Sequence, residues 1–254
     1  MKPQLGFVKT WVKAQWIPEL RQLVIVLNRL GDLVCYDGNY EFAIELFKEC
    51  LDISTELDDR YNQAIILNNL GTIAHLQENY AQADQYYHAS LSICNEIGDN
   101  DGVALAYSNL GELATVQGDY TAALNYSEQA LRIAEELEEH WTIIVCLNSL
   151  GEIYCAKNML EKSQQYFLQA IQLALDINGI DLVARVSVNY SRVLQLMGEN
   201  KKAINLLQAS LAHSSTEVDA REKAVAWLTE MEASFQIEMN DLILEEVVKE
   251  VINV

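Results

Sequence analysis

The chain has 254 residues, of which 50% are hydrophobic and 21% are charged, a balance typical of a folded protein. Its 17 lysines and arginines stand against 37 aspartates and glutamates, and the formal net charge of −20 argues against binding to nucleic acid or to an anionic membrane surface. Two prolines and eleven glycines leave too little turn material for a fold of many strands, so the composition favours an all-α protein.

Residues 1–19 are predicted to form a short amphipathic helix. Phe7, Trp11 and Trp16 would make up its apolar side, and we expect it to lie as a lid over the helices that follow. Pro18 would begin the next helix, where a missing N–H is tolerated. The segment shows no small-residue cleavage site, and no apolar run in the chain approaches the ~20 residues of a membrane span. We therefore expect a cytoplasmic protein that does not bind a membrane.

A repeat of forty residues fills the centre of the chain. The segments LNRLGDL, LNNLGTI, YSNLGEL and LNSLGEI begin at Leu27, Leu67, Tyr107 and Leu147, and they place a glycine at positions 31, 71, 111 and 151. A period of this length indicates a solenoid. Apolar residues recur every three or four positions on both sides of a break such as DGNY or QENY, so each unit is predicted to form two helices.

The pattern of each unit resembles the tetratricopeptide (TPR) repeat. In the first helix, a large residue is followed by Leu-Gly and then by a small or aromatic residue. In the second helix, an alanine is followed four positions later by an aromatic residue. In the second unit these positions hold Leu67, Leu70, Gly71, Ala74, Ala83 and Tyr87. The period of 40, rather than about 34, is similar to that of kinesin light chains, Pins-type adaptors, peptide-pheromone receptors and the sensor regions of STAND-type signalling ATPases. The resemblance implies a right-handed α-solenoid of antiparallel helix pairs.

The repeats predict three parts of the chain. Five hairpins are expected over residues 20–214, and residues 215–254, including Trp227, are expected to form a degenerate sixth hairpin that caps the array. A glycine inside a helix costs about 1 kcal/mol, which close helix packing would offset. Each glycine is therefore expected to lie against the small residue found twelve positions later, which is Ala43, Ala83, Ala123 or Ser163.

The resemblance also implies which side chains face a partner. In TPR arrays the first helices of the hairpins line a concave groove, and the columns three before, two before and one after the glycine correspond to that face. Together with His75 and Arg185, these columns give the candidate partner-binding residues Asn28, Arg29, Asp32, Asn68, Asn69, Thr72, Ser108, Asn109, Glu112, Asn148, Ser149, Glu152, Asn189 and Arg192.

Asparagine recurs in two of these columns, although it is a mediocre helix former. One interpretation is a ladder of amides that bind the backbone of an extended peptide. The other is that the amides bond to the neighbouring helix or to water and fix the spacing of the repeats. Glu112 and Glu152 favour a basic partner segment, whereas Arg185 and Arg192 favour an acidic group or a C-terminal carboxylate near the fifth hairpin. The partner is thus expected to be a protein or peptide with a basic segment, and the formation of a homodimer is left open.

No catalytic motif occurs in the sequence. It contains no Gly-rich phosphate loop, HExxH or GxSxG, and the five cysteines are scattered and expected to be free thiols in the core. We therefore expect a protein that is not an enzyme and has no cofactor or metal. Two functions fit: a scaffold that holds a peptide or helix of a partner, and the ligand-sensing region of a larger regulator such as a STAND-type ATPase or a pheromone receptor.

Overall fold

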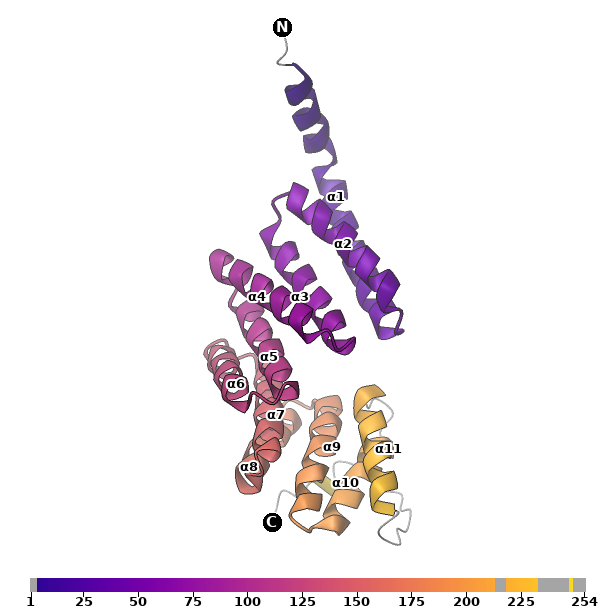
Figure 1. Cartoon of the computed structure of the whole chain (residues 1–254), viewed down its shortest axis with the longest axis vertical. Coiled ribbons are helices and arrows are strands. Elements are labelled where there is room, and N and C mark those ends of the chain that lie inside the picture. The colour runs from indigo at the N-terminus through magenta and orange to yellow at the C-terminus, as the bar shows by residue number, and fades with distance from the viewer. Residues whose placement is uncertain (1–3, 213–217, 233–246, 249–254) are drawn as a thin grey trace. The chain divides into compact units, whose positions relative to one another are not determined.

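The computed structural model describes residues 4–212, 218–232 and 247–248. Over these residues the chain consists of α-helices joined by tight turns, without a strand, which confirms the prediction of an all-α solenoid of antiparallel helix pairs (Figure 1). The chain forms two compact units, Met1–Leu113 and Ala114–Val254.

The hairpins follow one another along the chain, with odd-numbered first helices and even-numbered second helices. The first unit holds α1 (Gln4–Tyr36), α2 (Tyr40–Glu56), α3 (Arg60–Leu76), α4 (Tyr80–Ile97) and most of α5 (Asn100–Val116). The second unit holds the end of α5 and α6 (Tyr120–Glu136), α7 (His140–Ala156), α8 (Leu160–Asp176), α9 (Ile180–Leu196), α10 (Asn200–Ala212) and α11 (Val218–Glu232).

The forty-residue repeat consists of two equal halves. Helices α2 and α3 each have 17 residues, and so do α6, α7, α8 and α9. One residue with positive φ follows each helix from α1 to α9, and these residues recur every twenty positions at Gly38, Asp58, Glu78, Gly98, Gly118, Glu138, Asn158, Asn178 and Gly198. The next helix is often capped by an Asp or Asn: the Asp59 carboxylate accepts from the backbone N–H of Asn62 at 3.2 Å. Turn chemistry therefore sets the helix length.

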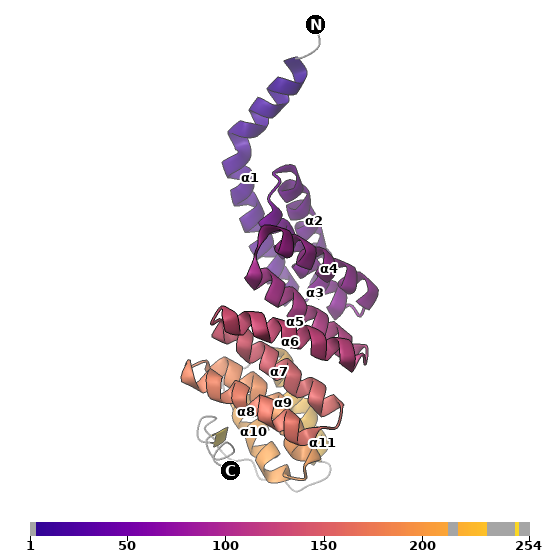
Figure 2. The same cartoon turned by 90° about the vertical axis from the view of Figure 1, so that its left-hand side faces the viewer.

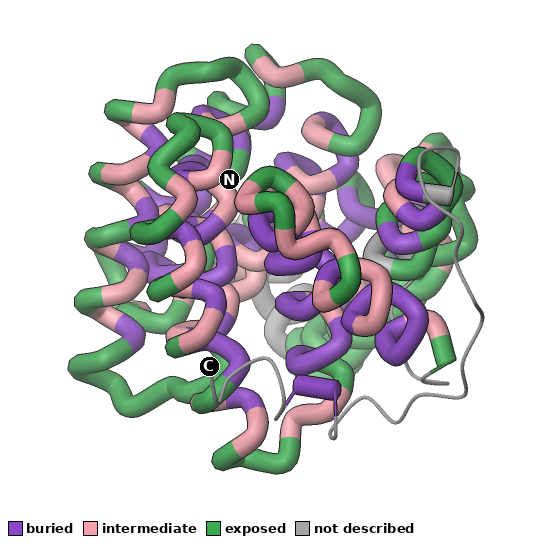
Figure 3. The backbone as a smooth tube through the Cα atoms, turned by 90° about the horizontal axis from the view of Figure 1, so that it is seen from below, coloured by how far each residue is buried: buried purple, intermediate pink, exposed green. Residues whose placement is uncertain are grey.

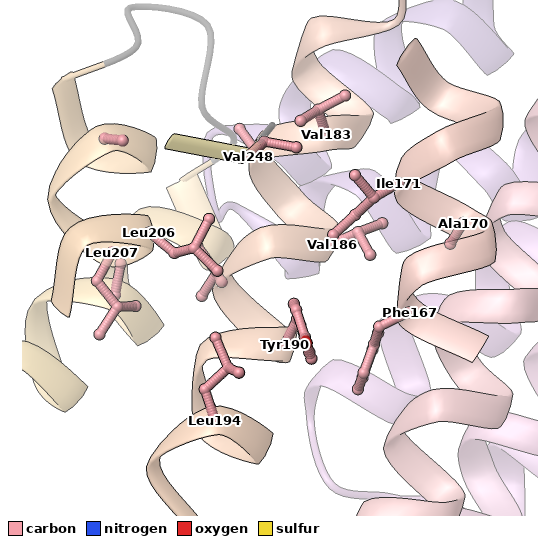
Figure 4. Close-up of a cluster of buried hydrophobic side chains, with 14 of the residues drawn as sticks. Phe167, Ala170, Ile171, Val183, Val186, Tyr190, Leu194, Leu206, Leu207 and Val248 are labelled. Atoms are coloured by element: carbon pink, nitrogen blue, oxygen red, sulfur yellow. The ribbon is translucent and has the colours of Figure 1, made fainter. Parts of the chain in front are cut away.

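Apolar side chains of successive helices form the core of each unit. In the first unit, Val24 of α1 joins Phe47 of α2 and Ile66, Leu70 and Ile73 of α3. A larger cluster extends through the second unit (Figure 4), where Phe167 and Ile171 of α8 meet Val186 and Tyr190 of α9. Figure 3 shows that buried and exposed stretches alternate along the helices. Each helix thus buries one side against its neighbours.

The repeated glycines lie where the two helices of a hairpin pack most closely. A Cβ added at Gly71 would be 2.6 Å from ring atoms of Tyr87, and one added at Gly151 would be 2.7 Å from the ring of Phe167. In the first, second and fourth hairpins the nearest neighbour is therefore an aromatic ring sixteen positions later, where the third hairpin has Ser127, rather than the small residue twelve positions later. That small residue also lies close in the fourth hairpin, because the Ser163 hydroxyl donates to the Gly151 carbonyl at 2.6 Å.

The first and last segments differ from the predicted boundaries. Helix α1 is continuous and has Pro18 in its interior, so the prediction that Pro18 begins a new helix is wrong. Figures 1 and 2 show its N-terminal part extending beyond α2, and Trp16 is 55% exposed; the side chains of Phe7 and Trp11 lie outside the described residues. At the other end, α11 covers the segment predicted as the first helix of the sixth hairpin, whereas the segment predicted as its second helix, 240–251, lies outside the described residues except for 247–248. The division into lid, hairpins and cap stays a prediction.

Gly71→Ala should destabilise the first unit by up to about 2 kcal/mol, because overpacking costs ~1–3 kcal/mol and the better helix propensity of alanine returns ~1 kcal/mol. The measurement is urea unfolding of the wild type, Gly71→Ala, Tyr87→Leu and the double variant. We expect a smaller penalty for Gly71→Ala in the Tyr87→Leu background. An equal penalty in both backgrounds would show that the Tyr87 ring is not the cause.

Candidate functional site

The predicted amide columns form hydrogen bonds between neighbouring first helices. In the first unit, the Asn69 amide donates to the Asn28 carbonyl oxygen Oδ1 at 3.2 Å and to Asp32 Oδ1 at 3.0 Å. One repeat later, Asn109 donates to Asn68 Oδ1 at 2.7 Å. The two asparagines of each pair are 41 residues apart in the sequence. The donor lies two positions before the glycine of its own repeat, and the acceptor lies three positions before the glycine of the preceding repeat.

The same bond recurs in the second unit. Asn189 of α9 donates to Asn148 Oδ1 of α7 at 3.1 Å, and Asn148 donates in turn to Glu152 Oε2 at 3.2 Å. The amides of Asn69, Asn109 and Asn189 therefore hold adjacent first helices in register, as the second interpretation of the asparagines requires. Their contact with a partner stays a prediction.

The candidate residues differ in how much of each side chain solvent can reach. The column three before the glycine is the most deeply placed, which favours a structural role for it. Buried are Asn68, Ser108, Asn148 and Asn189; half-buried are Asn28, Asn69, Thr72, His75, Asn109, Ser149, Glu152, Arg185 and Arg192; exposed are Arg29, Asp32 and Glu112. The columns two before and one after the glycine thus offer most of the surface that a partner can touch.

A pocket opens among the first helices of the second unit. It has a volume of about 220 Å³ and is lined by Glu152, Cys155 and Ala156 of α7, Phe167 of α8, Asn189 and Arg192 of α9, and Trp227 of α11. Three of these residues belong to the predicted columns. The other four were not predicted as site residues, although Cys155 occupies the column of His75, four positions after the glycine, which was a usable signal.

Charged and apolar groups meet at this pocket. Arg192 Nη1 donates to Glu230 Oε1 of α11 at 3.2 Å and to Gln195 Oε1 at 2.7 Å, so its charge is balanced within the protein. Burial raises the pKa of the Cys155 thiol, the nearby Arg192 charge lowers it and Glu152 raises it. The net shift is upward, so the thiol stays protonated near neutral pH. The pocket therefore combines an apolar wall with one cation and one anion.

Arg185 and His75 lie apart from this arrangement. The guanidinium carbon of Arg185 is 5.9 Å from the ring centroid of Trp141, a cation–π distance, and Arg185 is not among the residues that line the pocket. His75, in the last turn of α3, contacts the ring of Tyr80 edge-on at a centroid distance of 5.9 Å. The structure thus brings Asn148, Glu152, Asn189 and Arg192 together, whereas neither Arg185 nor His75 lines the pocket.

Three of the five cysteines are buried, and two are half-buried. All five are free; the buried ones are Cys50, Cys94 and Cys146, and the half-buried ones are Cys35 and Cys155. Burial, followed by the charge of nearby acidic groups, raises the pKa of Cys50 to about 11 and that of Cys146 to about 12.

Among the described residues, no group of three or more His, Cys, Asp and Glu side chains is placed to hold a metal ion. In that same part of the chain, no helix has the length and apolarity needed to cross a membrane.

Residues 30–232 match the family of MalT-like TPR regions, and the chain belongs to this family. No curated protein matches the sequence. Solved structures with the same fold include BtubC (BKLC) from P. vanneervenii, with 19% identity and a TM-score of 0.65 over 87% of this chain and 86% of that one.

Two further solved structures are similar to this chain. One is a STAND signal-transduction ATPase with a tetratricopeptide repeat sensor from Pyrococcus horikoshii, with 18% identity, a TM-score of 0.62 and coverage of 83% of this chain and 37% of that one. The other is a Rap protein complexed with Competence and Sporulation Factor, with 16% identity, a TM-score of 0.64 and coverage of 92% and 66%. At these identities the likeness shows the fold alone.

Asn109→Ala should lower the free energy of unfolding by about 1 kcal/mol, because it removes one net hydrogen bond and leaves the buried oxygen of Asn68 without its donor, while alanine gains a few tenths in helix propensity. Ser149→Ala is the matched control in the same column, since Ser149 makes no hydrogen bond from its side chain to the described residues; it should change stability by less than about 0.5 kcal/mol. Thermal unfolding of both variants measures this, and equal stabilities would remove the amide bond as a register element.

Proposed function

We propose that this chain is a non-catalytic protein-interaction module of the cytoplasm that binds an extended segment of a partner protein on the first helices of its second unit. The observation that carries the proposal is the pocket between α7, α9 and α11. One large apolar side chain of the partner enters this pocket, and the adjoining peptide backbone lies along the column that Asn189 and Arg192 occupy.

The composition of the pocket supports a peptide ligand. Phe167, Cys155 and Trp227 supply the apolar contact that makes a buried side chain an anchor of binding. A peptide group carries one donor and one acceptor, and the pocket offers both kinds of partner in the Arg192 guanidinium and the Glu152 carboxylate. A volume of about 220 Å³ suits one side chain, since pockets for drug-sized ligands are usually about 300–1,000 Å³.

Charge supports a basic partner segment. The chain has a net charge of −20. On the first helices, Glu112 of α5 is exposed and Glu152 of α7 is half-buried. The acidic group expected near the fifth hairpin has less support, because Arg192 is already paired with Glu230. We therefore propose lysines or arginines beside the anchoring side chain, which would also speed association with an acidic surface.

A second candidate function has an observation in its favour. Two comparisons support a ligand-sensing region within a larger regulator. One is the match to MalT-like TPR regions. The other is the likeness to a STAND ATPase with a tetratricopeptide repeat sensor, where the match covers 37% of the ATPase chain. The Rap complex with Competence and Sporulation Factor supports a peptide as the sensed ligand. The same pocket would serve in either case, and the two functions differ in whether an effector domain is attached.

The test uses a pocket-filling variant and a displayed library of random dodecapeptides. Peptides enriched on the wild-type chain should share one aromatic or large aliphatic residue flanked by lysine or arginine. Ala156→Trp places a bulky ring in the pocket from an exposed position, and it should weaken the enriched peptides at least about tenfold in calorimetry, a loss of ~1.4 kcal/mol. Ala81→Trp, at an exposed position of α4, is the control and should leave affinity unchanged.

Two results would contradict the proposal. One is a library without enrichment over an unrelated helical protein. The other is a set of enriched peptides that bind Ala156→Trp and Ala81→Trp equally well, which would move recognition away from the pocket.

A further inference from the structure

Helix α1 carries a stripe of large apolar side chains that solvent reaches. Leu33 is 60% exposed, Val26 59%, Trp16 55%, and Leu23 and Leu30 are each 39% exposed. Their spacing of seven, three, four and three residues places them on one side of the helix. Exposed apolar stripes of this kind mark interaction surfaces.

The later first helices bury the same columns. The column of Val26 continues at Ile66, Ala106, Cys146 and Val186, each 0% exposed. The column of Leu30 continues at Leu70, Leu110, Leu150 and Tyr190, none above 3%, and that of Leu33 at Ile73, Leu113, Ile153 and Val193, none above 2%. The stripe on α1 is thus the surface that an internal hairpin covers.

The cover in the internal hairpins is the second helix of the preceding hairpin. Ile66, Leu70 and Ile73 of α3 share a cluster with Phe47 and Cys50 of α2. In the second unit, Val186 and Val193 of α9 share one with Ile171 and Ala174 of α8. Within the described residues, no helix takes that place on α1, as Figures 1 and 2 show. A helix laid on the stripe would therefore repeat an interaction that the fold already uses.

We propose that this helix is α1 of a second copy of the chain, so that two copies form a symmetric dimer through the stripe of Trp16, Leu23, Val26, Leu30 and Leu33. The spacing of the stripe is that of a coiled-coil seam, in which like helices pair along matching apolar edges. A two-fold axis brings the same surface of both copies together. The surface is self-complementary because the same five apolar residues come from both copies; the exposed Glu19 occupies the one seam position between Trp16 and Leu23 that is not apolar.

Helix length and charge both favour a second copy. With 33 residues, α1 is almost twice as long as the 17-residue helices of the internal hairpins, and its N-terminal part extends beyond α2. It carries four basic and two acidic residues, in a chain whose net charge is −20. Contact along α1 therefore brings together a segment that is not acidic, and the repulsion is weaker than it would be between two acidic surfaces of the chain.

Analytical ultracentrifugation of the full chain over a wide range of micromolar concentrations tests the dimer. The wild type should sediment as a species of twice the 28.7 kDa chain mass at the upper concentrations. Val26→Glu should raise the dissociation constant at least about a hundredfold, because each dimer would bury two new carboxylates in its centre. Leu33→Glu should act in the same way. Leu76→Glu alters a side chain that is 54% exposed on α3, and it should leave the dimer intact.

Circular dichroism shows whether each variant keeps its helices, which we expect because the altered side chains are exposed. A wild-type chain that stays monomeric at all concentrations would overturn the proposal, since the stripe would then belong to another occupant. A dimer that survives both Val26→Glu and Leu33→Glu would overturn it too, as would growth beyond a dimer, which indicates head-to-tail contact. These outcomes are independent of the peptide test, because the pocket lies in the other unit.

Discussion

Burial of each first helix against the second helix of the preceding hairpin is the constraint on which the other features depend. Three columns of the first helices, represented by Val186, Tyr190 and Val193 in α9, are completely buried from the second hairpin to the fifth. A single hairpin leaves these columns in water, as α1 does. Since burying one large apolar side chain contributes about 1.5–3 kcal/mol, most of the stability of a hairpin comes from its neighbour. The repeat period of forty residues keeps the columns in line.

The proposed binding of a partner uses the side of the first helices that this burial leaves open. The columns of Asn189 and Arg192 lie beside the buried ones, and there the amides hold the helices in register. Because neighbouring first helices are kept at a fixed spacing, side chains from α7, α9 and α11 meet around one pocket. The rigid helices thus supply the preorganised surface that a partner segment can bind without ordering the protein further.

The fold could be predicted from the sequence because its determinants are local and repeated. Gly71 and Gly151 recur in phase, and the turns recur with them every twenty residues. The continuity of α1 through Pro18 could not be predicted, since an interior proline costs about 3 kcal/mol and local rules end the helix there. The pocket was half predicted: Glu152 and Arg192 follow from the columns, but Trp227 reaches the pocket from α11 through packing that no local pattern encodes.

The most direct test of the central claim compares one substitution at two positions of the same column. Val186 of α9 is 0% exposed and Val26 of α1 is 59% exposed, so both variants replace the same side chain in the same register. Val186→Asp should lower the free energy of unfolding by at least about 3 kcal/mol, because it buries an unpaired charge, whereas Val26→Asp should change it by less than about 0.5 kcal/mol at a concentration where the chain is monomeric. Similar losses for the two variants would contradict the account, because burial between hairpins would then not be the source of stability.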